Sequence, residues 1–519
     1  MELNLNMNTL LCVVGVIVMI YAWKLFNWIL LKPKKIDKFL RDQGLNGNSY
    51  KFLYGDIKEM VQMTADAKLK PINLTDNILP RVMPFFLKSA NTYGKGKNFF
   101  TWMGPRPMVH VTEPALIREI LNNYNKFQKP KGGNPLTKLL AQGIVSADAD
   151  QWVKHRKIIN PAFHVEKLKH MLPAFYISCS EMIDKWENLT KEGSCEVDVY
   201  PHLQTFTSDV ISRTAFGSSY EEGRKIFVLQ MEQAQLVINA LQSLYIPGSE
   251  FLPTKNNRRM KEIAREVKAS VNDIINKRVT AMKAGERSSD DLLGILLDSN
   301  YKEIEEGGDK NLGLSIDEVI EECKLFYFAG QETTANLLVW TMILLGQYTN
   351  WQDRARDEVL KMFGERKPDI DGLSRLKVIN MILHEVIRLY PAGIGLGRMV
   401  HEETTVGNIT LPAGSFLQLH MMLLHYESDM WGNDVNEFNP ERFAEGVSKA
   451  TKEQASYFPF GGGPRICIGQ NFAMLEAKLA LVMILRSFSF ELSPSYTHAP
   501  HTIITLQPQF GAQVVLHKL

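Results

Sequence analysis

One cysteine stands in a loop whose neighbours suit a metal ligand. Cys467 closes the run Phe460-Gly-Gly-Gly-Pro-Arg-Ile-Cys, and a helical pattern of apolar residues follows over 471–488. The positive end of a helix dipole stabilises a thiolate, and consecutive glycines let the backbone approach a flat ligand closely. Arg465 can reach an anionic group on such a ligand. An inert cysteine in a surface turn stays open as the other interpretation, whereas a cysteine nucleophile lacks a histidine base within the loop.

An acid and two threonines interrupt an apolar stretch. The run Ala329-Gly-Gln-Glu-Thr-Thr334 lies inside the hydrophobic segment 325–345. Adjacent β-branched hydroxyls, a glycine and an acid are poor choices for a simple buried helix. The structural interpretation is a helix kink in which the threonines bond back to the preceding turn. The functional interpretation uses the same distortion to make room for a bound molecule, with Glu332 and Thr333 passing protons to it.

Two other pairs have the spacing of one helical turn. Glu385 and Arg388 stand three residues apart, and Trp152 and Arg156 stand four apart. Residues at these spacings lie on one face of a helix and can interact there. Taken alone, each is also an ordinary amphipathic surface pair.

The elements that would carry these residues are mainly helical, because apolar positions recur at the helical period and strand-like runs are few. The predicted helices are 114–124, 154–172 with a break near Pro161, 208–216, 256–284, 316–348, 351–363, 376–390 and 471–488. The predicted strands are 98–103, 107–111, 405–411, 415–419, 487–492, 502–507 and 513–517. We therefore expect a mainly α fold with small β-sheets (α+β), in one large domain over 51–519.

The N-terminus has the pattern of a membrane anchor. Residues 10–31 are apolar apart from four positions, and at about 1.5 Å per residue they match a hydrocarbon core of about 30 Å. No small-residue cleavage pattern follows, which argues against a signal peptide. Five basic residues occur over 32–41. We therefore expect 1–9 to be lumenal, 10–31 to span the membrane and 32–50 to form a cytosolic basic linker. A buried core helix is the alternative.

The bulk composition argues against several classes of protein. The 519 residues carry a net charge of only +2, which gives no support for nucleic acid binding. Five cysteines without a paired framework indicate a reducing compartment and no disulfide scaffold. None of them has the spacing of a zinc cluster.

Together these motifs resemble those of a known family. Phe460, Gly463, Arg465, Cys467 and Gly469 match F-x-x-G-x-R-x-C-x-G, the signature of the cytochrome P-450 haem-thiolate monooxygenases. The other motifs agree in order, so the resemblance covers nearly the whole chain. It implies the cytochrome P-450 fold and haem b (iron protoporphyrin IX). Cys467 would be the axial iron ligand, whose electron donation favours O–O cleavage.

The resemblance also implies roles for the other motifs. Glu332 and Thr333 would be catalytic and deliver protons to bound oxygen. Seven residues would contact or bind the haem. Three of them are Ala329, Phe460 and Gly469, and the four at its propionates are Trp152, Arg156, Arg398 and Arg465. A structural network around the cysteine loop would consist of Glu385, Arg388 and Arg442, which match the pattern E-x-x-R/P-E-R-F.

A finer resemblance is to the plant branch that contains secologanin synthase and the triterpenoid oxidases. It rests on the runs 155–164, 209–217, 326–330 and 493–500, whereas the glycine-rich substrate loops 129–135 and 392–397 depart from that group. By resemblance the pocket is mostly apolar, which suits an isoprenoid skeleton. Its expected lining includes Pro135, Leu136, Phe326, Ile394 and Leu396.

The resemblance implies a monooxygenase that inserts one atom of dioxygen into a terpenoid C–H bond, iridoid or triterpenoid, in plant specialised metabolism. Electrons would come from NADPH through a separate NADPH–cytochrome P-450 reductase, and basic residues in 154–169 could border its docking surface. The expected location is the endoplasmic reticulum membrane, with the catalytic domain cytosolic. Two alternatives stay open: a haem-thiolate isomerase or dehydratase that needs no reductase, and a non-catalytic haem-binding membrane protein.

Overall fold

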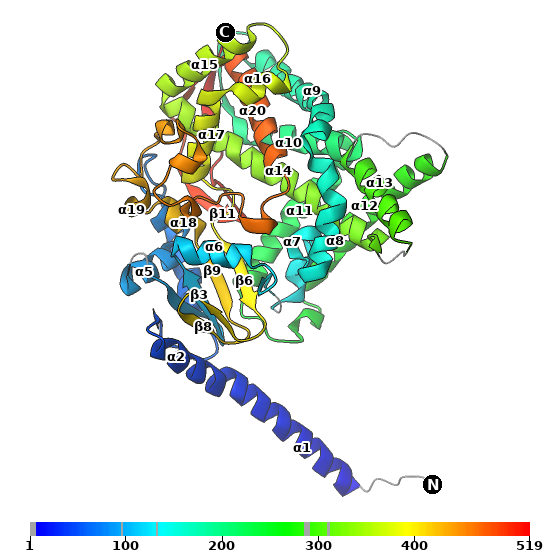
Figure 1. Cartoon of the computed structure of the whole chain (residues 1–519), viewed down its shortest axis with the longest axis vertical. Helices are drawn as coiled ribbons and strands as arrows, with labels where there is room; N and C mark the ends of the chain where they lie inside the picture. The colour runs from blue at the N-terminus through cyan, green and yellow to red at the C-terminus, as the bar shows by residue number, and fades with distance from the viewer. Residues whose placement is uncertain (1–6, 95–96, 131–132, 285–290, 309–311) are drawn as a thin grey trace.

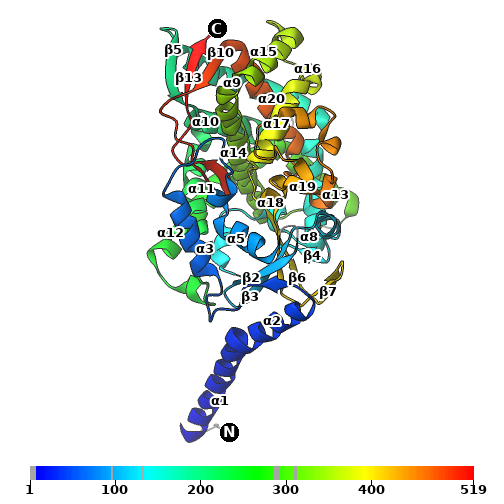
Figure 2. The same cartoon turned by 90° about the vertical axis from the view of Figure 1, so that its left-hand side faces the viewer.

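Helices make up most of the molecule, and small sheets lie towards two ends of it (Figures 1 and 2). The computed structural model describes the chain except residues 1–6, 95–96, 131–132, 285–290 and 309–311. The helices are α1 Met7–Phe26, α2 Lys32–Asp42, α3 Ile57–Lys68, α4 Leu79–Val82, α5 Pro84–Tyr93, α6 Pro114–Asn122, α7 Gly143–Ser146, α8 Ala149–Ile159, α9 Val165–Leu189, α10 Val199–Phe216, α11 Tyr220–Leu241, α12 Lys255–Lys283, α13 Leu292–Gly307, α14 Ile316–Gln347, α15 Thr349–Phe363, α16 Ile370–Arg375, α17 Lys377–Leu389, α18 Met421–His425, α19 Ser428–Trp431 and α20 Gln470–Ser487.

Within the described residues, the strands form one larger sheet and three small ones. They are β1 Asn46–Gly47, β2 Phe99–Met103, β3 Arg106–Val111, β4 Phe127–Gln128, β5 Ser194–Asp198, β6 Leu396–Val400, β7 Thr404–Val406, β8 Ile409–Leu411, β9 Phe416–Leu419, β10 Phe488–Leu492, β11 Pro500–Ile503, β12 Thr505–Pro508 and β13 Gln513–Lys518. The larger sheet has the order β1-β2-β3-β9-β6-β4, and β10-β13-β5, β11-β12 and β7-β8 are separate. Strands from the two halves of the chain therefore share one sheet.

Helix α14 is the central element of the core. It begins at a capping box, in which Ser315 and Glu318 bond to each other's backbone N–H groups, and it is buried along most of its length. A helix that is apolar on nearly every side must be surrounded by other elements. Helices α10, α12, α17 and α20 pack around it, and its Trp340 ring stacks on Tyr390 with centroids 4.3 Å apart. The position of α14 decides where the functional residues of its middle turns lie.

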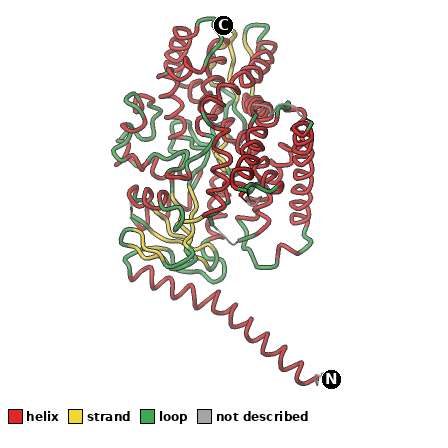
Figure 3. Tube along the Cα trace, turned by 45° about the vertical axis from the view of Figure 1, so that its right-hand side comes forward, coloured by secondary structure: helices red, strands yellow, loops and turns green. Residues whose placement is uncertain are grey.

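The fold class predicted from the sequence is confirmed, since helices predominate and the strands are few (Figure 3). Two predicted strands are wrong in detail, because each is a hairpin. Residues 405–411 divide into β7 and β8 at Gly407, whose φ of +55° permits a tight turn, and 502–507 divides between β11 and β12 at Ile504. Strand β6, which carries Arg398, is not anticipated by the sequence pattern.

The N-terminal helix projects away from the rest of the molecule (Figures 1 and 2). Helix α1 continues through a π-helical turn, Asn27–Leu31, into α2. Among the described residues, Leu10–Asp42 is the one helical stretch long and apolar enough to cross a membrane, and its apolar part is exposed. The segment 32–50 differs from the linker expected from its composition, because α2 is helical and buries Ile36 and Leu40 against the larger sheet.

Candidate active site

Backbone contacts fix the shape of the cysteine loop. The Cys467 N–H donates to the Phe460 carbonyl (2.8 Å). The loop turns at Gly463, whose φ is +63°. A Cβ there would lie 2.4 Å from the Leu121 carbonyl oxygen, so only glycine fits. Helix α20 begins at Gln470, just after the cysteine. The loop therefore presents the sulfur close to a helix N-terminus, as the sequence indicates.

The Cys467 sulfur faces open space within the protein. Its side chain is exposed, yet burial raises the pKa of the thiol, while the Gly469 N–H and the Arg156 guanidinium lower it. A side chain that is both exposed and strongly desolvated lies on the wall of an interior space rather than on the outer surface. A thiolate here needs a further positive charge, and a metal ion bound to the sulfur would supply one. The environment therefore fits a sulfur-ligated metal.

The Phe163 ring connects α14 to the cysteine loop. Its centroid lies 6.0 Å from that of Phe326 on α14 and 6.5 Å from that of Phe472 on α20. It also lies 3.9 Å from a Cβ placed at Gly469. Ala329, one turn after Phe326, is exposed although most of α14 is buried. Open space therefore lies beside Ala329 as well as beside the sulfur, and both belong to elements joined through Phe163.

The acid–threonine run does not interrupt α14. The Thr333 hydroxyl donates to the Ala329 carbonyl (2.8 Å), which is the back-bonding expected from the sequence. The expected kink, however, does not break the helix, which is continuous from Ile316 to Gln347. A Cβ at Gly330 would lie 2.6 Å from the Ile211 side chain, so this glycine allows α10 to approach.

Glu332 lies against the C-terminal hairpin. It accepts hydrogen bonds from the Thr505 hydroxyl (2.8 Å) and the Asn336 amide (3.4 Å). Its Oε2 is buried and, in the part of the chain that the structure describes, has no partner. Burial raises the pKa of this carboxyl, which favours the protonated form. Glu332 and Thr333 are adjacent in the chain, yet no hydrogen bond between their side chains is found within the described residues.

Two arginines beside the cysteine loop have buried guanidinium nitrogens without hydrogen-bond partners among the described residues. Arg465 donates to the Ala147 carbonyl (2.8 Å) and Arg398 to the Gly397 carbonyl (2.9 Å). Arg465 Nε and Nη1 and Arg398 Nε are buried and have no partner among the described residues. Burial, assisted by the charge of Arg465, lowers the pKa of Arg398 to about 10. Unsatisfied buried cations are costly, so this pair fits a ligand with anionic groups, such as the haem propionates.

Lys129 is a third cation of this cluster, and the sequence did not single it out. Burial, followed by the charges of Arg398 and Arg465, lowers the pKa of its amine to about 7, and Asp148 opposes this. Its backbone N–H donates to Asp148 (3.1 Å). No motif marks Lys129, because the residues that surround it come from distant parts of the chain. The one feature of the sequence that could have indicated Lys129 is its place in the glycine-rich loop 129–135, which the resemblance assigns to the substrate.

Helix α8 also contacts the cysteine loop. The Arg156 guanidinium donates to the Ile466 carbonyl (2.8 Å), and the Arg465 guanidinium lies over the Trp152 ring at 4.9 Å. The W-x-x-x-R pair therefore contacts the loop directly. Two lysines of the same helix are less available for a partner protein than the sequence suggests, because Lys154 pairs with Glu318 and Lys157 with Glu303.

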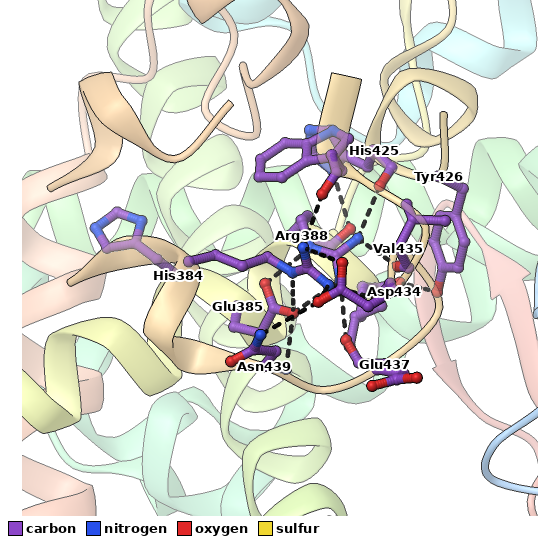
Figure 4. Close-up of polar contacts among 12 residues, drawn as sticks. His384, Glu385, Arg388, His425, Tyr426, Asp434, Val435, Glu437 and Asn439 are labelled. Carbon is purple, nitrogen blue, oxygen red and sulfur yellow. Dashed lines mark hydrogen bonds and ion pairs between the residues drawn. The ribbon is translucent and has the colours of Figure 1, made fainter. Parts of the chain in front are cut away.

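The E-x-x-R/P-E-R-F residues form a buried network (Figure 4). Arg388 donates to both Glu385 oxygens (2.8 and 2.7 Å) and to the carbonyls of His425 and Val435 (2.9 and 2.8 Å). Arg442 also pairs with Glu385 (3.4 Å). Every Arg388 nitrogen is thereby used, so these residues have the packed, structural arrangement that the sequence resemblance implies.

The expected substrate-pocket residues lie in different surroundings. Leu136 is buried in a small cluster with α11 and α12, and Pro135 is exposed. Phe326 packs against Phe163, as described above. Leu396 and Ile394 are half-buried, and Leu396 lies 3.8 Å from a Cβ placed at Gly461 of the cysteine loop. Leu396 and Phe326 are therefore near the cysteine loop, whereas the cluster of Leu136 packs against Phe328 of α14.

Comparisons with known proteins agree with this site. The cytochrome P450 family model matches residues 81–513. "Cytochrome P450 CYP72A219" of Panax ginseng is 62% identical over the full length of both chains. "7-deoxyloganic acid hydroxylase" of Catharanthus roseus is 53% identical, again over the full length of both. Among solved structures, "Retinoic acid bound cyanobacterial CYP120A1" shares the fold, with a TM-score of 0.74 and 24% identity over 92% of this chain and 99% of that chain.

The site thus combines a sulfur held just before a helix, arginines whose buried nitrogens lack partners among the described residues, and a central helix with an acid–threonine run. The family model covers almost the whole of this chain. The chain belongs to the cytochrome P450 family. It is a P450 monooxygenase, and membership of the family implies haem.

Proposed function

We propose that this protein is a membrane-anchored haem-thiolate monooxygenase that hydroxylates a terpenoid. The observation that carries the haem part is the desolvated Cys467 sulfur on the wall of an interior space, beside two arginines whose buried nitrogens lack hydrogen-bond partners among the described residues. The substrate class is supported by the 53% identity to a protein named 7-deoxyloganic acid hydroxylase. The same proposal includes the endoplasmic reticulum membrane, with a cytosolic catalytic domain and NADPH electrons delivered by a separate reductase.

Each group at the site has a part in this proposal. Cys467 ligates the iron, and Arg398 and Arg465 bind the propionates together with Lys129. Bound haem supplies the oxygen-activating chemistry. Thr333 holds a proton-bearing hydroxyl beside the open space next to Ala329. Glu332, whose pKa is raised by burial, can hold a proton and resupply it to the site.

The ligand assignment is tested with Cys467→Ala. The reduced, carbon-monoxide-bound spectrum is expected to lose the thiolate-type Soret band. Cys195→Ala is the matched control, because Cys195 lies in β5, far from the cysteine loop in the fold, and it should keep that band. Survival of the band in Cys467→Ala would rule out this cysteine as the ligand.

The reaction is tested by a product assay of membranes with reductase against iridoid, triterpene, steroid and gibberellin panels. Product from an iridoid or triterpene that requires both NADPH and reductase supports the proposal. Turnover without NADPH would instead indicate an isomerase or dehydratase. If haem binds and no substrate changes its spectrum, a non-catalytic haem protein becomes the better description.

A further inference from the structure

A basic cavity lies where the N-terminal helix meets the larger sheet. Its volume is about 270 Å³. It is lined by Trp28, Lys32, Ile36, Pro105, Arg106, Pro107, Met399, Ala413 and Gly414. Two of these residues, Lys32 and Arg106, are cations, and none is acidic. Among the residues that the structure describes, neither cation takes part in an ion pair or a side-chain hydrogen bond. The cavity therefore carries positive charge that nothing in its lining neutralises.

The cavity is a fixed feature of the fold, because α2 is docked firmly beside it. The Gln43 amide donates to the Thr410 carbonyl (2.9 Å) and accepts from the Thr410 N–H (2.6 Å). Arg41 donates to the Gly47 carbonyl (2.9 Å), and its guanidinium lies over the Phe100 ring at 5.1 Å. These bonds hold the wall formed by α2 in one position relative to the sheet.

The position of the cavity along the chain sets its depth in a bilayer. The apolar stretch ends at Leu31, and Lys32 is the first cation after it. A tryptophan followed by a lysine at the end of a membrane span lies at the level of the lipid headgroups. Trp28 and Lys32 both line the cavity, so its opening lies at this level if residues 10–31 span the membrane, which is part of the proposed function.

An exposed apolar segment lies beside the turn that precedes Arg106. A Cβ at Gly104, in the β2–β3 turn beside Arg106, would lie 3.3 Å from Leu244. Leu244 belongs to a segment whose Ile246 and Phe251 side chains are 60% and 78% exposed. Large apolar side chains exposed to this degree suit contact with lipid rather than water. The cavity thus has an exposed apolar segment near Arg106 and the end of the apolar N-terminal helix near Lys32.

We propose that this cavity binds the headgroup of an anionic membrane phospholipid, with Lys32 and Arg106 contacting its phosphate. Arginine binds phosphate oxygens through two parallel N–H groups, and the lysine adds a point charge. A zwitterionic headgroup would also bring a cation towards the same two charges. Anionic phospholipids are therefore preferred over phosphatidylcholine.

The test measures lipid retained by the full-length holoprotein in neutral detergent micelles that contain equal traces of phosphatidic acid and phosphatidylcholine. A neutral micelle has no surface potential, so general attraction by exposed lysines is removed. Native mass spectrometry then counts bound lipid. The wild type is expected to retain phosphatidic acid in preference. The Lys32→Gln/Arg106→Gln variant should retain at least about five-fold less, since a direct hydrogen bond between a cation and a phosphate is worth about five-fold or more.

The matched control is Lys35→Gln/Lys38→Gln, which makes the same charge change on exposed positions of α2 outside the cavity. It is expected to retain phosphatidic acid as the wild type does. Equal retention of the two lipids by the wild type, or equal loss in both variants, would overturn the proposal. Displacement of the lipid by inorganic phosphate would also overturn it, by showing a site for free anions.

Carbonate washing of membranes separates this proposal from the proposed function. If the wild type is washed free, the membrane anchor itself is wrong, and the cavity cannot lie at headgroup level. If it stays in the membrane and shows no preference among lipids, only the cavity proposal fails. The reduced carbon monoxide spectrum of each variant checks that the haem domain is intact.

Discussion

At the scale of single residues, the site is governed by groups whose charged forms burial disfavours. The Cys467 thiol and the cations Lys129, Arg398 and Arg465 all have pKa values shifted towards their neutral forms, and burial is the largest cause in each case. An anionic, metal-bearing ligand reverses both effects at once, because it gives the sulfur a cation and gives the cations an anion. The four groups therefore favour one kind of ligand together.

Lys129 makes haem binding depend on pH. Its pKa is about 7 without an anionic ligand, and a propionate beside it would raise that value. Haem binding then takes up a proton above pH 7, so haem affinity should fall as pH rises through 7. Soret titration of the haem-free protein on either side of pH 7 measures this. Lys129→Gln should bind haem more weakly and lose this pH dependence, whereas Lys138→Gln, an exposed control in the same region, should behave as the wild type.

Thr333 supplies a hydroxyl beside the open space next to Ala329. Thr333→Ala removes that hydroxyl together with its bond to the Ala329 carbonyl. Because general acid catalysis is typically worth about 10²-fold or more, we expect product formation to fall by about that factor while NADPH oxidation falls less. Thr333→Ser keeps the hydroxyl and should recover most of the product. Equal product yields per NADPH in Thr333→Ala and the wild type would contradict the role.

At the scale of elements, a buried acid–imidazole contact joins α8 to α14. Glu322 on α14 bonds to His155 Nδ1 on α8, both side chains are buried, and Glu322 Oε2 is left without a partner among the described residues. Glu318, one turn earlier on α14, lies 3.3 Å from His155 Nε2. Helix α8 carries Trp152 and Arg156, which contact the cysteine loop. The contact between Glu322 and His155 therefore positions these two residues relative to α14.

Glu322→Gln is expected to weaken this junction. It removes the charge from a buried hydrogen bond and should lower the free energy of unfolding by about 1–3 kcal/mol. Asp317→Asn is the control on the same helix, because Asp317 is 75% exposed and pairs only at the surface with Lys268; a change below about 1 kcal/mol is expected there. Urea unfolding measures both. Comparable losses in the two variants would show that the junction adds no stability.

At the scale of the whole molecule, buried neutral histidines should make the fold sensitive to acid. Burial lowers the pKa of His420 and His425 to about 3 and that of His498 to about 4, from an ordinary 6.5. Above pH 6.5 these groups are neutral in both the folded and unfolded chain and contribute nothing. As pH falls from 6.5 towards 3, only the unfolded chain takes up their protons, so the free energy of unfolding falls.

His420→Gln tests this effect at one position. His420 Nε2 lies 2.7 Å from His110 Nδ1, and glutamine can replace this contact without titrating. Between pH 6.5 and about 4, the free energy of unfolding, obtained from the unfolding midpoint, should fall less in His420→Gln than in the wild type. The difference is expected to be up to about 1.4 kcal/mol per pH unit. His517→Gln, at an exposed histidine, serves as the control and should follow the wild type.

The sequence by itself determined the elements and motifs whose physics is local. The helical period placed most of α6, α12, α14, α15, α17 and α20 close to their observed bounds. Glycine spacing and the following helix identified the Cys467 loop, because positive φ angles and a helix N-terminus depend on neighbouring residues only. The span 10–31 and the E-x-x-R pair are likewise readable from residue types over one or two turns.

Tertiary structure alone decided which distant groups meet. It brought Lys129 to Arg398 and Arg465, joined His155 to Glu322, turned Glu332 to Thr505, and docked α2 so that a cavity forms beside Lys32. These contacts depend on how α14, α8 and the larger sheet pack, and packing is set by burial and shape over the whole chain rather than by any local period. The sequence therefore predicted the ligand residue, and the fold decided the charges around it.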